Sequence, residues 1–530
     1  MNADDGKRSI GKVVSVTADR FVVELHGGTD NFTIVGFDDM EYVARLGSFL
    51  MIPAQDEYVV AEISGLRERD PTVGGSGPDK MEKSSSSKYL DLVPLGMLPK
   101  DSAGSFRFGV SNFPALYADA LYALSAELDR IFETVEPFKS DGDEPTKWTS
   151  LAIGNSVIFD DYPVKLKIDP FFGGHSAILG NTGSGKSCTL ASILQALFEK
   201  PNEHRARGST FVIFDVNGEY SDALSGLKVE GEIGVRDVSF DVDREASFFL
   251  PHWFLDASEW ELLLQASERA QVPILRSALG LTSLFNDGAS ADLASVRNHV
   301  LATCILQILG DESSSPSSAD RITAILNKFG TAEISTATIG SFIRVRYGEM
   351  DDVESLTCFL QGDDDGDGGF LKPGFRVPDY QNTPFDFDNL GAALDLAILY
   401  EEAHGNRQIR DYCSSLLTRY KALQERDEFA FVRCTTAADG ATFKQREYLS
   451  TILGLVNNED RGYEKSHQII ILDMNSVDDE IVALVASVLS RMIFSILRRL
   501  DPRNRFPVHL VLEEAHRYIC LLYTSDAADE

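Results

Sequence analysis

The stretch GNTGSGKS, residues Gly180 to Ser187, decides which fold this 530-residue chain can adopt. It matches the pattern G-x-x-x-x-G-K-[ST] at every defined position, and it follows an apolar run, Ala177–Leu179, that predicts a strand. The sequence KSCTLASILQALFE behind it has the spacing of a helix. Strand, glycine-rich turn and helix in this order predict a phosphate-binding loop, because glycines let successive N–H groups turn toward phosphate oxygens. The alternative is that this stretch is a glycine-rich turn that arose by chance. The strand and the helix predicted on either side of it disfavour that alternative.

The members of this loop have separate expected roles in binding ATP. Lys186 is expected to reach the β- and γ-phosphates, and Ser187 to supply a hydroxyl ligand to Mg²⁺. The predicted nucleotide-binding set comprises Gly180, Asn181, Thr182, Gly183, Ser184, Gly185, Lys186, Ser187 and Cys188.

A second apolar run, VHLVLEEAH at 508–516, ends in the paired acids Glu513 and Glu514. An NTP-hydrolysing protein needs one acid on the metal side and one base that orients the attacking water. Side chains alternate along a strand, so two adjacent acids need not compete for one place. We assign Glu513 to the metal and Glu514 to the water. The alternative is that both acids only cap the segment that follows them.

Further polar side chains end other predicted strands. In FDVNGEY, Asp215 and Glu219 are possible site residues, although a turn at Asn217-Gly218 explains the pattern equally well. Asp473, at the end of IIILD, is a weaker candidate. His516 is the histidine nearest to the paired acids, and it is a candidate contact to phosphate or to a neighbouring subunit.

The composition restricts the possible partners and compartment. A formal net charge of −33 argues against a surface that coats nucleic acid, although a channel or loop can still be locally basic. A salt-adapted source would give the same balance. The six cysteines include no C-x-x-C pair, which favours a reducing cytoplasm over a disulfide framework or a zinc site. The sequence has no signal-peptide pattern and no apolar run of about 18 residues, so we expect no membrane association.

The patterning predicts a mixed α/β organisation. Short β-type runs over 10–63 favour a small β-barrel or sandwich, and the spacing over Pro114–Phe132 predicts a helix. The runs STFVIFD, SHQIIILDM and VHLVLEE predict a parallel sheet whose ligands sit at the carboxyl ends of its strands. More than two hundred residues of mostly helical pattern separate the second of these runs from the first, which predicts a helical insertion.

The acidic stretch GDDDGDGG at 362–369 resembles the first half of a calcium loop. Asp363, Asp365, Asp367 and Gly368 fit that half, but Gly374 stands where the loop requires glutamate. We therefore expect a solvated acidic loop.

A β-rich N-terminal module, GNTGSGKS, DVNGEY and LVLEEAH in this order resemble the HerA-type branch of the HerA/FtsK ATPases, from Ile10 to about Ile519. The resemblance implies an α/β fold: a RecA-like P-loop NTPase core with a parallel sheet, an inserted helical bundle and an N-terminal β-barrel. It also implies a homo-hexameric ring that moves double-stranded DNA through its pore with ATP and Mg²⁺. A NurA-type nuclease in DNA end processing, or another effector in phage defence, is the implied partner.

On this resemblance we divide the chain into four parts. A HAS-barrel-like N-terminal β-barrel is expected over 9–100 and a helical linker over 101–147. A HerA-type central domain is expected over 148–519, with the helical insertion at about 225–460. The family continues past E-E-A-H, so we expect the core to be incomplete at its C-terminus. The segment CLLYTSDAADE, 520–530, back-translates into the end of a transposase adapter used in sequencing libraries, so we expect this segment to be a translated artefact.

Two questions stay open at this level. The family's trans-acting arginine has three candidates, Arg491, Arg498 and Arg499, but the solvated face of an amphipathic helix explains them equally well. The alternative to a DNA motor is an ATP-binding ring scaffold or sensor that assembles an effector nuclease without translocation. A metabolic kinase fits poorly, because adjacent acids favour activated water over a positioned acceptor hydroxyl.

Overall fold

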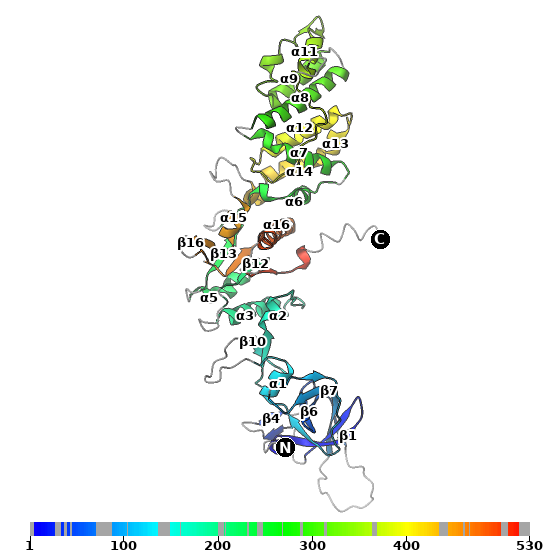
Figure 1. Cartoon of the computed structure of the whole chain (residues 1–530), viewed down its shortest axis with the longest axis vertical. Coiled ribbons are helices and arrows are strands. Elements are labelled where there is room, and N and C mark those ends of the chain that lie inside the picture. The colour runs from blue at the N-terminus through cyan, green and yellow to red at the C-terminus, as the bar shows by residue number, and fades with distance from the viewer. Residues whose placement is uncertain are drawn as a thin grey trace, which may run out of the picture. The chain divides into compact units, whose positions relative to one another are not determined.

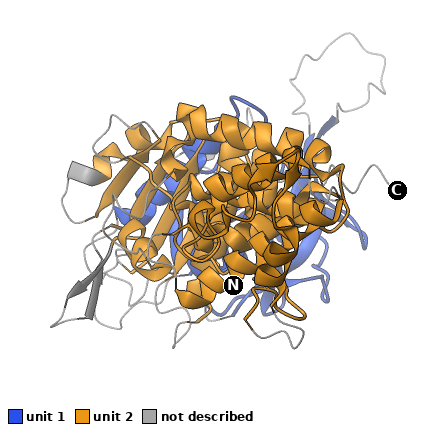
Figure 2. Ribbon diagram, turned by 90° about the horizontal axis from the view of Figure 1, so that it is seen from above, with its two compact units in different colours: residues 1–206 blue, residues 207–530 orange. Residues whose placement is uncertain are grey.

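A computed structural model of the chain divides it into two compact units, residues 1–206 and 207–530, and each is described by itself (Figures 1 and 2). The structure describes residues 5–26, 33–35, 40–42, 45–69, 87–102, 104–135, 149–159, 161–199, 206, 208–229, 233–240, 247–267, 269–286, 290–311, 315–362, 368–433, 444–458, 462–465, 467–499 and 507–518. The expected terminal artefact at 520–530 lies outside these residues.

The first unit contains the predicted barrel, which is closed and antiparallel. Its strands follow the order β2-β1-β9-β5-β6-β7, and the pairing of β2 with β7 closes the ring, while β8 extends β7. A short hairpin, β3 with β4, follows β2 in the chain. The strands are β1 (Ser9–Val16), β2 (Phe21–Leu25), β3 (Thr33–Val35), β4 (Met40–Tyr42), β5 (Phe49–Ala54), β6 (Glu57–Arg69), β7 (Ser87–Pro99), β8 (Arg107–Phe108) and β9 (Asp119–Tyr122).

The barrel closes through a segment in which the sequence predicted only a helix. Within 114–132, β9 pairs with β1 and β5, and the helix α1 is confined to Ser125–Ile131. Ala120 and Leu121 are fully buried, because alternate side chains of β9 enter the inside and the outside of the barrel wall. The helical expectation is wrong over β9, since closing a barrel satisfies the two open edges that a helix would leave unpaired.

The same unit continues with a hairpin and the helix that follows the glycine-rich loop. β10 (Ser150–Asn155) pairs with β11 (Pro163–Lys167), α2 (Ile168–Phe172) follows, and α3 (Lys186–Phe198) lies against β10. The strand predicted over Ala177–Leu179 is not formed, and Leu179 is 90% exposed. A strand requires a hydrogen-bonded neighbour, and none of the described residues of the first unit pairs with this segment as a strand.

The second unit is built on a four-stranded parallel sheet, as predicted. Its order is β13-β18-β12-β19, with β12 (Thr210–Asp215), β13 (Val235–Ser239), β18 (Ile469–Asp473) and β19 (Val508–Leu512). The pairing Asp215 with Asp473 and Phe214 with Leu512 brings three carboxyl ends to one edge. β12 is buried along its whole length, which explains its continuous apolar run. β13 was not predicted, because its sequence VRDVS alternates only weakly.

Most helices of the second unit follow β13 in the chain, within the range 225–460 of the predicted insertion. α7 and α12 pack together, and α8 contacts α9, α11 and α12 (Figure 1). The helices of this unit are α4 (Tyr220–Ala223), α5 (Ser225–Val229), α6 (Ala257–Leu263), α7 (Gln271–Leu281), α8 (Ala291–Asp311), α9 (Pro316–Phe329), α10 (Thr336–Ile339), α11 (Val353–Gln361), α12 (Asn389–Ala403), α13 (Ile409–Tyr412), α14 (Ser414–Glu425), α15 (Gln445–Ile452) and α16 (Asp479–Leu497). Two small hairpins, β14 (Val345–Arg346) with β15 (Glu349–Met350) and β16 (Leu455–Asn458) with β17 (Gly462–Lys465), complete it.

Two of these helices, α8 and α16, are long and apolar enough to cross a membrane by length and composition alone. The most apolar windows of α8 and α16 are 50% and 56% buried inside the structure. Both helices belong to the single apolar core that joins the sheet to the insertion. Core helices pass the same test, so this finding is weak support for a membrane span.

Candidate nucleotide site

The glycine-rich loop takes its shape from backbone conformation. Gly183 and Gly185 have φ values of 79° and 87°, which lie in the left-handed region that glycine adopts without steric cost. A Cβ atom at Gly180 would lie 2.3 Å from the Ser184 hydroxyl oxygen, so a side chain there would require the Ser184 hydroxyl to move. Residues 180–184 are all exposed. The sequence therefore places glycine at the two positions, Gly183 and Gly185, where the backbone conformation favours it.

The helix α3 begins at the last residues of the motif. Gly185 occupies the N-cap position, and no side chain caps the helix there. The ammonium of Lys186 donates to the Asn181 carbonyl oxygen at 3.5 Å, so it lies back over the loop, and Ser187 stands in the first turn. Thirteen residues of helix direct the positive end of their dipole toward this turn. These residues fit a nucleotide phosphate, and the Ser187 hydroxyl is a hard oxygen ligand of the kind that Mg²⁺ prefers.

In the second unit, Asp215 occupies the carboxyl end of β12 and is fully buried. Its carboxylate accepts hydrogen bonds from the N–H groups of Gly218, Glu219 and Tyr220 at 2.8, 3.2 and 2.9 Å. It thereby caps the turn that leads into α4. Asp215 was predicted as a possible site residue, and the structure gives it a structural role in this turn.

Glu513, directly after β19, is also buried, with 8% of its surface exposed. One carboxylate oxygen accepts from the N–H groups of Val216 and Asn217 at 3.1 and 3.3 Å, and the other accepts from the Asn217 side-chain amide at 3.1 Å. Burial, followed by a hydrogen bond shared with Asp215, raises the pKa of Glu513 above its ordinary value. Both oxygens of Glu513 are thus engaged with the β12 turn.

Glu514 differs from Glu513 in its exposure, its backbone conformation and its contacts. Its side chain is 29% exposed, and its backbone has a φ of 49°, a left-handed conformation that is uncommon for glutamate. Its carboxylate lies 3.3 Å from the Nδ1 atom of His516. Of the two predicted acids, Glu514 is therefore the one that is accessible to a substrate, and it places His516 in its immediate environment.

The remaining predicted residues lie around this edge in different ways. Glu219 is exposed at the start of α4, and Asp473 accepts from the Asn475 N–H at 3.3 Å at the end of β18. The sequence did not single out Asn217, which binds Glu513, or Asn475, whose amide would lie 2.7 Å from a Cβ at Gly218. The Asn217-Gly218 pair predicted a turn at this place, but it did not predict that Asn217 binds Glu513.

Arg491, one of the three candidate arginines, forms ion pairs within its own chain. Arg491 pairs with Glu259 at 2.7 Å and with Asp256 at 3.3 Å, and donates to the Phe254 carbonyl at 2.7 Å. It therefore links α16 to α6. Arg498 and Arg499 are exposed at the end of α16. The trans-acting role of Arg498 or Arg499 stays a prediction.

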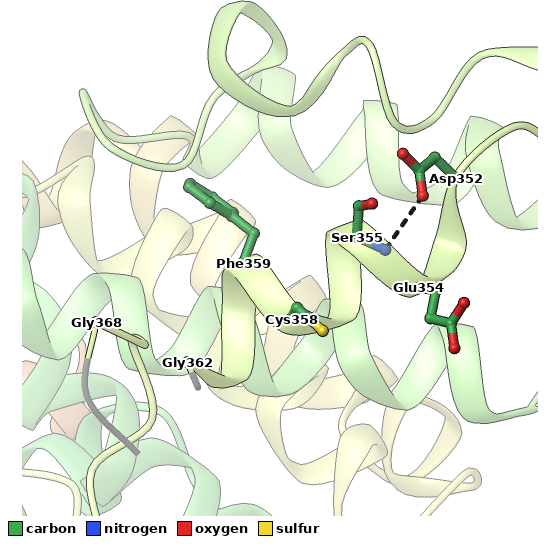
Figure 3. A pocket seen from close by; sticks show the side chains of 7 residues that line it. All are labelled: Asp352, Glu354, Ser355, Cys358, Phe359, Gly362 and Gly368. Carbon is green, nitrogen blue, oxygen red and sulfur yellow. Dashed lines mark hydrogen bonds between the residues drawn. The ribbon is translucent and has the colours of Figure 1, made fainter. Parts of the chain in front are cut away.

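A pocket of about 570 Å³ lies along α11, and no residue that lines it belongs to the ends of β12 or β19 (Figure 3). Asp352 caps this helix by accepting from the Ser355 N–H at 3.2 Å, and Glu354, Cys358 and Phe359 line the same groove. The predicted solvated loop at 363–367 lies outside the described residues. Among the residues that are described, no cluster of three or more His, Cys, Asp or Glu could hold a metal ion.

A glycine-rich loop that opens a helix, and a parallel sheet with acids at its carboxyl edge, define a P-loop NTPase of the α/β class. Residues 151–343 match the family model described as "Helicase HerA, central domain". A 72-residue segment, 14% of the chain, is 42% identical to "Probable helicase MJ1565" of Methanocaldococcus jannaschii and spans 13% of that protein's length. These matches support the predicted resemblance to HerA/FtsK-type ATPases over this part of the chain.

Proposed function

We propose that the chain is an ATP-hydrolysing DNA translocase or helicase that works as a homo-hexamer. The observation that supports this most directly is the loop with left-handed Gly183 and Gly185 at the start of α3, within the region that matches the HerA central domain. We place its action on double-stranded DNA in the cytoplasm, in DNA end processing or phage defence, with a NurA-type nuclease or another effector as its partner.

In this proposal the residues of the chain divide the reaction among them. The loop amides and Lys186 bind the phosphates, Ser187 holds Mg²⁺, and Glu514 orients the attacking water. Mg²⁺, when bound, neutralises the charge that develops on the transferred phosphoryl group. The exposure of Glu514 beside the engaged Glu513 supports giving the water-orienting role to Glu514 alone.

The net charge of −33 is compatible with a DNA partner if positive charge is confined to the lining of a ring channel. Phosphate contacts there would be independent of sequence and sensitive to salt. The proposal therefore requires that DNA binding weaken steeply as the salt concentration rises.

The test is the rate of ATP hydrolysis by the full-length protein with and without duplex DNA, with Lys186→Ala as the control for contaminating ATPases. A DNA motor should hydrolyse ATP several-fold faster with long duplex DNA, and that gain should disappear at high salt. Hydrolysis that is indifferent to DNA, in a ring that retains a nuclease, would instead support the scaffold or sensor function. A protein without measurable ATP binding would contradict both.

A further inference from the structure

Five consecutive backbone N–H groups, those of residues 216–220, donate to two buried carboxylates at the carboxyl edge of the sheet. Glu513 accepts the first two and Asp215 the last three. The Asn217 side chain adds a sixth bond, to the second oxygen of Glu513. The turn after β12 is thus held by one carboxylate from its own strand and one from β19, which is almost three hundred residues away in the sequence.

This arrangement leaves Glu513 poorly suited to direct contact with a metal ion. A carboxylate that turned toward Mg²⁺ would abandon the N–H groups of Val216 and Asn217, and buried donors without acceptors are costly. Hydrogen bonds from N–H groups to an ionised carboxylate are also among the stronger ones in proteins. The observed contacts favour a fixed position over a movable ligand.

The segment after Glu513 is restrained at several further points. Arg517 forms an ion pair with Asp479 of α16, and its N–H donates to the Glu514 carbonyl at 2.8 Å. The Tyr518 hydroxyl donates to the Phe214 carbonyl of β12 at 3.4 Å. Between these restraints Glu514 keeps its left-handed backbone, a conformation that persists in a non-glycine residue only where its surroundings impose it.

We infer that Glu513 is a positioning residue: its carboxylate fastens the end of β19 to the β12 turn and thereby fixes the backbone from which Glu514 extends. The part of this inference that concerns hydrolysis rests on the proposed function. The part that concerns the contact between β19 and the turn does not, because it can be measured without nucleotide. Asp215 holds the other half of the same turn, so the pair acts as one structural unit.

The first experiment measures thermal unfolding of the full-length protein in EDTA without nucleotide. Glu513→Gln keeps the shape of the side chain but places an amide donor among N–H donors, so we expect a lower melting temperature, by about 2 °C or more. Asn217→Ala should also lower it, and the double variant should lose less than the sum of the two, since both remove one contact. Glu514→Gln, the matched control, should melt like the wild type.

The second experiment measures ATP hydrolysis against Mg²⁺ concentration, well below the melting temperature of each variant. We expect Glu513→Gln and Asn217→Ala to lower kcat, while the KM for ATP and the half-saturating Mg²⁺ concentration stay at wild-type values. A metal ligand would behave differently: Glu513→Gln would melt like the wild type in EDTA and need several-fold more Mg²⁺, and Asn217→Ala would have no effect. That result would overturn the inference.

The two experiments also separate this inference from the proposed function. A wild-type protein without ATPase activity would contradict the proposed function, while the melting temperatures would still decide whether Glu513 and Asn217 are coupled. Additive melting effects of the two substitutions would overturn the contact between β19 and the turn, even in an active ATPase.

Discussion

The glycine-rich loop and the acidic edge of the parallel sheet were both predicted as parts of one nucleotide site, but they are built in opposite ways. The loop is exposed, and neighbouring residues in the sequence determine its form through the left-handed Gly183 and Gly185. At the edge Asp215 and Glu513 are buried, and the position of Glu513 depends on hydrogen bonds from the turn that follows β12. A motif can thus specify a local backbone shape, whereas the role of a buried acid depends on partners from distant segments.

The largest effect should come from the exposed side of this comparison. Lys186→Ala removes the only cationic side chain of the loop and should reduce ATP hydrolysis by about 100-fold or more. Because Lys186 follows a loop whose residues 180–184 are all exposed, the unfolding curve should barely move. Steady-state kinetics and urea unfolding test the two halves of this expectation. A large loss of stability would show that the loop depends on Lys186 for its fold.

His252 is another buried titratable side chain whose properties depend on partners from distant segments. His252 lies in the short helix His252–Phe254, with its two ring nitrogens 2.8 Å from the Phe385 carbonyl and 3.2 Å from the Val432 carbonyl. Burial lowers the pKa of His252 to about 4, below the value of about 6.5 expected in the unfolded chain. Between these two pKa values the unfolded state therefore binds more protons than the folded state. The contribution of neutral His252 to the free energy of unfolding is fully present above pH 6.5 and is lost as the pH falls toward 4.

For His252 the expected loss is about 3 kcal/mol over that window. Denaturant unfolding at several pH values checks it, with His252→Gln as a comparison that cannot take up a proton. The variant should be less stable at pH 7 but should lose less stability between pH 6.5 and 4. Parallel pH profiles of the two proteins would contradict the low pKa of His252.

A smaller effect is expected from the acid that caps the β12 turn. Asp215→Asn keeps one acceptor oxygen but places an amide among three N–H donors, which should cost about 2 kcal/mol of unfolding free energy. Urea unfolding measures it, and Asp473→Asn, at the end of β18, serves as the control with one described N–H bond. Equal stability losses for the two variants would contradict the distinction between a buried capping acid and an ordinary strand end.

The smallest effect should come from a cap at a partly exposed position. Asp256 accepts from the Glu259 N–H at 2.9 Å and begins α6, and about a third of its side chain is exposed. Asp256→Ala should lower the unfolding free energy by about 1 kcal/mol. The same urea titration measures it. A loss as large as that of Asp215→Asn would show that burial does not rank these two caps.

Several elements could be predicted because their signals are local. Alternation along β1, β2, β5 and β6 predicted a barrel or sandwich, and the apolar runs of β12, β18 and β19 predicted the parallel sheet. The helix expected over 114–132 shows the limit of such signals. The apolar spacing of this segment suits a helix. Asp119–Tyr122 nevertheless form a strand, because they pair with β1 and β5 of the barrel. Arg491 shows the same limit, because Glu259 is its partner only in the folded chain.

By itself the sequence determined the glycine-rich turn, the helix that follows it, and which strands would end in acids. These features depend on backbone preferences and on the periodic burial of side chains, which act between near neighbours. Only the tertiary structure decided that Glu513 is enclosed by the β12 turn and that Glu514 is accessible. That difference arises from the parallel register of β12 and β19, which no pattern within either strand encodes.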